Sequence, residues 1–148
     1  MSFSITARDM RELRQFLSHV MTAKRQLKEI YYTASDADLK IDVKELVASL
    51  IGIQKTIEEL TKLAQKSKIA RKVFEDRKVS LTLRKWSVGL LKRVNAFVKR
   101  KKKMSLEHLS RYYESLLEYI QSISEELTGW ILDIDTLSEI PRPPKRES

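Results

Sequence analysis

The sequence predicts an all-α protein, an antiparallel bundle of about four long helices, and three observations support this. Apolar residues recur at alternating spacings of three and four through most of the 148 residues. Gly and Pro occur only three times each, whereas an all-β fold needs a turn about every 8–12 residues. The hydrophobic fraction of 42% excludes a disordered chain of low hydrophobicity. We expect a single bundle domain over 1–140 and a disordered tail over 141–148, where all three prolines lie.

The first helix is expected over 7–32. Thr6, followed by Asp9 three residues later, has the spacing of a capping box at its N-terminus. From Met10 to Tyr31 the apolar residues keep helical spacing, and Lys24 is the one polar residue in the seam. This pattern is typical of a helix that buries one face.

The second helix is expected over 39–66, because Ser35 to Asp38 supply several oxygen side chains that can cap its first turn. Apolar residues from Val43 to Ala64 continue the alternation of three and four without interruption. The sequence leaves open whether residues 66–80 continue this helix or whether it breaks near Lys66–Lys68.

The third helix is expected over 81–103, after a short period-two pattern at 79–83 that we interpret as a junction. Its seam includes Trp86 and Phe97, which we therefore expect in the core. The fourth helix follows Ser105, a candidate cap, and its seam runs from Leu109 to Ile134. Four helices of similar length with short connections favour an up-down-up-down arrangement.

Gly52, Gly89 and Gly129 each lie inside an apolar helical pattern. A glycine in a helix interior costs about 1 kcal/mol relative to alanine. We therefore expect a neighbouring helix to approach closely at each glycine, and a hinge or kink is the alternative.

The whole chain carries a net charge of +9, and its basic residues are concentrated in one segment. Residues 66–103 carry fifteen basic and two acidic side chains, whereas residues 104–140 carry one and eight. On a helix, Lys85, Lys92 and Lys99 lie opposite the apolar seam, about 10 Å apart. The residues predicted to contact nucleic acid are Arg71, Lys72, Lys85, Lys92, Arg93, Lys99, Arg100, Lys101, Lys102 and Lys103.

The charge pattern predicts a non-catalytic basic module that contacts nucleic-acid phosphates, in RNA or DNA, without reading the sequence. Such a module would serve as an accessory subunit of a nucleoprotein assembly. One alternative is a protein-interaction scaffold or helical homodimer whose basic face binds an acidic protein partner. A second alternative places 81–103 on an anionic membrane surface, with Trp86 and Phe97 as anchors. The sequence leaves open whether the acidic segment 104–140 lies against the basic helix and masks it.

The sequence does not predict an enzyme, a cofactor or a metal site. Cysteine is absent, and neither His19 nor His108 has a second ligand at metal-binding spacing. Glu114, Glu118 and Glu125 lack the Glu-x-x-His motif that di-iron bundles require. Since no run of 18 apolar residues occurs, we predict no membrane span and expect a cytoplasmic protein.

Overall fold

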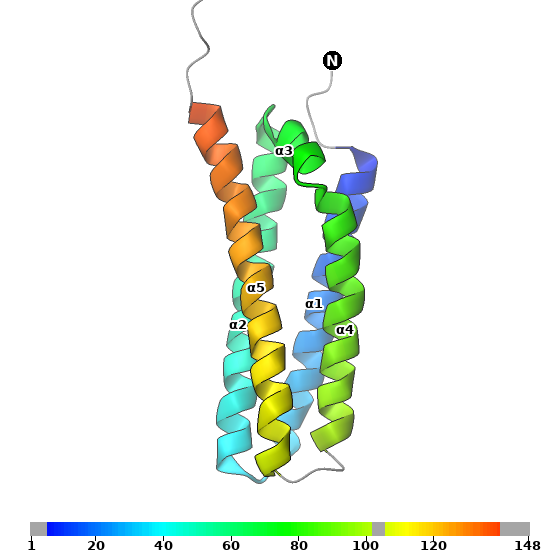
Figure 1. The fold of residues 1–148 in the computed structure, drawn as a ribbon, viewed down its shortest axis with the longest axis vertical. Helices are drawn as coiled ribbons and strands as arrows, with labels where there is room; N and C mark the ends of the chain where they lie inside the picture. The colour runs from blue at the N-terminus through cyan, green and yellow to red at the C-terminus, as the bar shows by residue number, and fades with distance from the viewer. Residues whose placement is uncertain (1–5, 102–105, 140–148) are drawn as a thin grey trace, which may run out of the picture.

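In the computed structural model, the described residues, 6–101 and 106–139, form five helices and no strand. The helices are α1 (Ala7–Thr33), α2 (Ala37–Lys66), α3 (Ala70–Asp76), α4 (Val79–Lys101) and α5 (Leu106–Glu139). The four long helices lie side by side, and the short α3 covers one end of them (Figure 1). The all-α prediction is confirmed, while the tail predicted over 141–148 lies outside the described residues.

Local signals position the first two helices as the sequence predicts. The amide of Asp9 donates a hydrogen bond to the Thr6 hydroxyl at 3.1 Å. The amide of Leu39 likewise donates to the Asp36 carboxylate at 2.8 Å. Because these side chains accept from amides that have no partner within the helix, each defines a helix start.

The connection between α2 and α4 settles the alternative that the sequence left open. The second helix ends at Lys66, and α3 is separate from it. The predicted junction at 79–83 is wrong, since α4 begins at Val79. Val79 and Leu83, four residues apart, are both buried on one helical face, whereas Leu81 is 55% exposed. The preceding turn places Lys78 at φ 52°, in the left-handed region.

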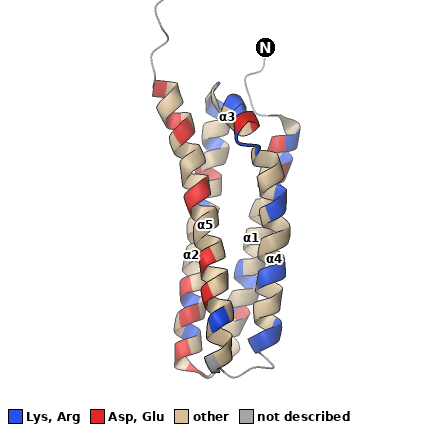
Figure 2. Cartoon of the chain, in the orientation of Figure 1, with Lys and Arg blue, Asp and Glu red and all other residues tan. Residues whose placement is uncertain are grey.

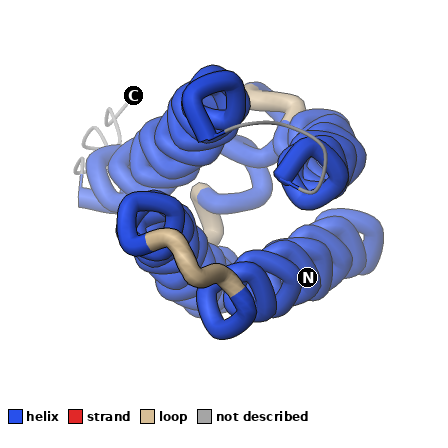
Figure 3. The backbone as a smooth tube through the Cα atoms, turned by 90° about the horizontal axis from the view of Figure 1, so that it is seen from below, coloured by secondary structure: helices blue, strands red, loops and turns tan. Residues whose placement is uncertain are grey.

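The predicted antiparallel four-helix arrangement is not confirmed, because two of the packed helix pairs run parallel. Helix α1 packs on α2 and α4, and α5 packs on the same two helices. The Ser80 hydroxyl, near the start of α4, donates a hydrogen bond to Asp9, near the start of α1. Ser67, just after α2, contacts Ser138, near the end of α5, at 2.9 Å. Thus α1 and α4 run in one direction, and α2 and α5 run in the other (Figure 1). Figure 3 shows the bundle of long helices from one end.

The connection over residues 67–78 explains this order. It includes α3, which packs on α2, α4 and α5. A connection of this length carries the chain across the end of the bundle, so that α4 lies beside α1 and not beside α2. A short loop would instead have placed consecutive helices next to each other.

The core contains the aromatic residues that the seams predict. Trp130 is 1% exposed, and its ring stacks on that of Trp86 with the centroids 5.0 Å apart. Trp86 also contacts Phe16, at a centroid distance of 5.7 Å, and Phe97 is fully buried. The prediction that Phe97 belongs to the core is confirmed, whereas Trp86 is half-buried and packs against the core. No described helix has the length and apolar character needed to cross a bilayer.

The glycine prediction is correct at one position and wrong at two. A Cβ at Gly89 would overlap the hydroxyl of Tyr119 from α5 and lie 3.0 Å from its Cζ. At Gly52 and Gly129 a Cβ would meet nothing within 4 Å, so no neighbouring helix approaches closely there. Only Gly89 therefore has a packing reason to lack a side chain.

We expect Gly52→Ala and Gly129→Ala each to raise the free energy of unfolding by about 1 kcal/mol, because alanine loses less backbone entropy in a helix. Gly89→Ala gains the same propensity but must displace Tyr119, so its net effect is smaller or destabilising. Urea denaturation followed by circular dichroism measures all three. If the Gly89→Ala protein is as stable as the Gly52→Ala protein, the Tyr119 side chain can move away from the added methyl group without lowering the free energy of unfolding.

Candidate nucleic-acid interface

Charge separates by helix pair in the folded protein. Together α1 and α4 carry thirteen basic and three acidic side chains, whereas α2 and α5 carry six and thirteen. Since α1 and α4 pack on each other, most of the positive charge gathers on one side of the bundle. Figure 2 shows Lys and Arg along α4 and Asp and Glu along α5.

The most regular feature of this side is a row of lysines on α4. Lys85, Lys92 and Lys99, which we call the α4 ridge, are exposed at intervals of seven residues. None of the three forms a hydrogen bond or an ion pair with any residue that the structure describes. Val88, on the same outer line, is 70% exposed. The ridge is therefore open to solvent over about 21 Å.

Helix α1 adds arginines that the charge count along the sequence did not reveal. Residues 1–65 are nearly neutral, with ten basic and nine acidic side chains. In the fold, however, Arg11 and Arg25 are exposed on the outer side of the helix beside α4 and have no partner among the described residues. We call these arginines together with the α4 ridge the α1/α4 face. The sequence alone could not identify this face, because it forms only when α1 and α4 pack side by side.

Two of the three acidic residues of α1 are turned toward α4. The Glu12 carboxylate forms an ion pair with Arg84 at 3.1 Å, and the Glu12 side chain is only 12% exposed. Asp9 accepts hydrogen bonds from Thr6 and Ser80. These contacts hold α1 against α4 and keep both carboxylates away from the outer surface.

The seam between α1 and α4 contains polar atoms without partners. His19 and Gln26 follow Glu12 at intervals of seven residues, so they lie on the side of α1 that meets α4. His19 Nδ1 and Gln26 Oε1 are buried, and neither atom forms a hydrogen bond with a residue that the structure describes. An unsatisfied buried polar atom costs about 1–3 kcal/mol, so these two atoms reduce the stability that the seam contributes.

The contact between α4 and α5 uses arginine–tyrosine stacking. The Arg93 guanidinium lies 4.0 Å from the centroid of the Tyr119 ring, and Arg100 lies 4.5 Å from that of Tyr112. Burial raises the pKa of Tyr119, although the nearby Arg93 opposes the shift. The side chains of α5 that lie against Arg93 and Arg100 are thus tyrosine rings and not carboxylates, so these contacts do not neutralise the two arginines.

The acidic helix does not mask the α4 ridge. Glu114, Glu118 and Glu125 are exposed on an outer line of α5, at spacings of four and seven residues. In the described part of the chain, no cation of α4 forms an ion pair with a carboxylate of α5. Negative charge therefore lies beside the basic face without neutralising it.

The structure divides the residues predicted from sequence into separate groups. Arg71 and Lys72 are exposed on α3, and Arg71 pairs with Glu75 at 3.7 Å. Helix α3 lies at the end of the bundle where α4 begins, and Lys99–Lys101 lie at the other end of α4, which is about 34 Å long (Figure 1). Lys101 is half-buried. Lys102 and Lys103 lie outside the described residues, so the α4 ridge with Arg93 and Arg100 forms the largest contiguous group.

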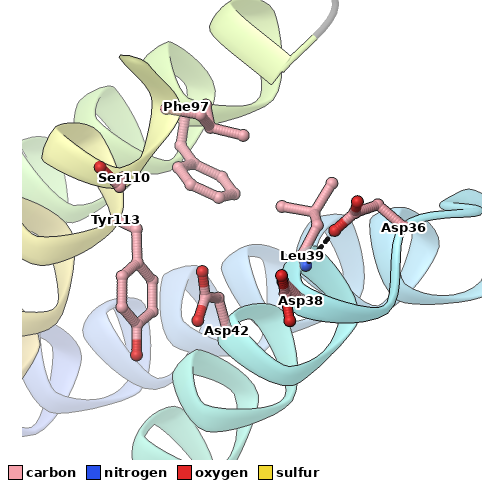
Figure 4. A pocket seen from close by; sticks show the side chains of 8 residues that line it. Asp36, Asp38, Leu39, Asp42, Phe97, Ser110 and Tyr113 are labelled. Carbon is pink, nitrogen blue, oxygen red and sulfur yellow. Dashed lines mark hydrogen bonds between the residues drawn. The ribbon is translucent and has the colours of Figure 1, made fainter. Parts of the chain in front are cut away.

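A pocket of about 270 Å³ near the start of α2 has the opposite charge (Figure 4). Its lining residues are Asp36, Asp38, Leu39, Asp42, Phe97, Leu109, Ser110 and Tyr113. Burial, reinforced by neighbouring carboxylates, raises the pKa of Asp42. The Tyr113 hydroxyl donates a hydrogen bond to Glu45, and burial together with this bond raises the pKa of Tyr113.

These carboxylates repel phosphates. Among the described residues, no group of three or more His, Cys, Asp or Glu side chains is arranged to hold a metal ion. The pocket is therefore a poor candidate for the same ligand as the α1/α4 face.

Comparison with protein-family models, curated proteins and solved structures finds no match to this chain, so the α1/α4 face itself is the guide to function.

Proposed function

We propose that this protein is a non-catalytic nucleic-acid-binding module whose α1/α4 face contacts phosphates of RNA or DNA without reading the sequence. In this proposal it acts as an accessory subunit of a nucleoprotein assembly. The observation that carries the proposal is the α4 ridge, three exposed lysines that pair with no described residue and lie beside a helix that adds exposed arginines.

Physical chemistry favours a phosphate polymer on such a face. Each cation that contacts a phosphate releases condensed counterions, which drives binding and makes it dependent on salt. Lysines at regular intervals on a rigid helix follow a backbone but carry no information about base identity. The arginines of α1 add planar donors that bind phosphate oxygens in pairs.

The contribution of α1 provides the direct test. We expect Arg11→Gln/Arg25→Gln to weaken binding of a labelled single-stranded oligonucleotide. The slope of log affinity against log salt should fall by about 1.4, because two contacts are lost. Lys55→Gln/Lys62→Gln is the matched control, since it removes the same charge from exposed positions on α2.

Fluorescence anisotropy over a salt series measures both variants. If the control reduces the slope as much as the α1 variant does, net charge determines binding, and the α1/α4 face is not the site. If the α1 variant alone reduces the slope, α1 forms part of the interface.

The outer line of α5 favours a second candidate, a helical homo-oligomer. Glu114, Glu118 and Glu125 are opposite in charge to the α4 ridge, and Leu132 on the same line is 58% exposed. In this candidate the α4 ridge of one copy meets α5 of the next. Sedimentation velocity at low salt tests it, because Glu118→Lys/Glu125→Lys should then dissociate the oligomer while oligonucleotide binding persists. A wild-type protein that sediments as a monomer at low salt would exclude it.

A further inference from the structure

Two arginine–tyrosine stacks flank the α4 ridge on its α5 side. Arg93 lies over Tyr119 and Arg100 over Tyr112, at 4.0 and 4.5 Å from the ring centroids. The two arginines are seven residues apart, as are the two tyrosines. Since α4 and α5 run in opposite directions here, the stacks form a repeat of about 10 Å along the bundle.

Each stack has its tyrosine inside and its arginine outside. Tyr112 and Tyr119 are half-buried, whereas Arg93 and Arg100 are exposed. Neither arginine forms an ion pair or a hydrogen bond with a described residue. The absence of a side chain at Gly89 is what allows Tyr119 to lie against α4 below Arg93. The rings thus hold two planar cations at the surface.

A guanidinium held over an aromatic ring in this way suits a nucleobase. Unpaired bases stack on arginine planes and aromatic rings, whereas bases within a duplex already have both faces covered by neighbours. Each of these arginines directly follows a ridge lysine, Lys92 before Arg93 and Lys99 before Arg100. Each pair therefore combines a phosphate contact with a flat surface for the base of the same strand.

We infer that Arg93 and Arg100, supported by Tyr119 and Tyr112, are stacking platforms for unpaired bases, and that the ligand of the α1/α4 face is single-stranded nucleic acid. This inference rests on the proposed function, because the ridge lysines must hold the phosphates of the strand. It adds a preference for strand state, which lysines alone do not provide.

The test compares three labelled probes of equal length: a single-stranded oligothymidine, an abasic deoxyribose-phosphate strand, and a duplex. The abasic strand keeps the phosphates and lacks the bases. Stacking on one platform is worth about 5- to 150-fold in affinity, so the oligothymidine should bind at least about fivefold more tightly than the abasic strand. The affinity for the duplex, compared at an equal number of phosphate contacts, should not exceed the affinity for the abasic strand.

Two variants separate stacking from charge. Arg93→Lys/Arg100→Lys keeps both charges but removes the planar groups, so we expect it to bind the abasic strand normally and to lose the preference for bases. Lys85→Gln/Lys92→Gln should weaken binding of both single strands equally and leave their ratio unchanged. Circular dichroism shows whether each variant has kept its helices.

The outcomes distinguish the stacking of bases from the phosphate binding on which it rests. If wild-type protein binds both strands equally, with a steep salt dependence, the stacking platforms are refuted while phosphate binding stands. If neither strand binds even at low salt, the nucleic-acid function itself is refuted. A base preference that survives in Arg93→Lys/Arg100→Lys would place stacking at another site.

Discussion

Replacing Lys85, Lys92 and Lys99 together with glutamine should reduce the slope of log affinity against log salt by about two units on a single strand. A face that makes six phosphate contacts has a slope of about −4 on a single strand and about −5 on a duplex. The three lysines are exposed and have no partner among the described residues. Their replacement therefore removes phosphate contacts and leaves the core intact.

The experiment titrates labelled oligonucleotides of unrelated sequence at several salt concentrations. Lys44→Gln/Lys55→Gln/Lys62→Gln is the matched control, because it removes three exposed charges from α2. Affinity should vary little among sequences, since phosphate contacts do not distinguish bases. A flat salt dependence in the wild-type protein would favour the protein-interaction alternative, in which a few desolvated residues supply most of the affinity.

Trp130→Ala should lower the free energy of unfolding by about 3–5 kcal/mol, the usual cost of truncating a buried aromatic residue. Trp130 is 1% exposed and stacks on Trp86, which also contacts Phe16, so its ring lies where α1, α4 and α5 meet. Domains of this kind are stable by only about 5–15 kcal/mol in total. The loss is therefore a large part of the stability.

Urea denaturation monitored by circular dichroism measures this loss. Leu132→Ala, two residues further along α5, is the control, because Leu132 is 58% exposed and surface substitutions usually change stability by less than about 0.5 kcal/mol. Similar losses in the two variants would show that the contact between the two tryptophans does not define the core.

The long helices could be predicted almost to the residue because their signals are local. The predicted spans 7–32 and 39–66 compare with Ala7–Thr33 and Ala37–Lys66 in the structure. Periodic apolar residues and capping side chains act within a few residues of each other. The short α3 was not predicted, since its seven residues are too few to establish a period.

The candidate site could be predicted in part. The α4 ridge follows from helical geometry alone, because residues seven apart share one face. The arginines of α1 could not be assigned to it, since nothing in residues 7–33 indicates which helix will lie beside them. Arg93 and Arg100 were predicted as phosphate contacts, and their stacking on α5 depends on the position of a helix that follows later in the chain.

The sequence by itself determined that this protein is helical, which face of each long helix is buried, and where its positive charge lies along the chain. Only the tertiary structure decided the order of the helices around the bundle. Hydrophobic burial is non-directional, so an apolar seam specifies that a face is covered but not which helix covers it. Here the connection over 67–78 places α4 parallel to α1. That packing joins two basic helices into one face and leaves the acidic α5 on the other side of α4.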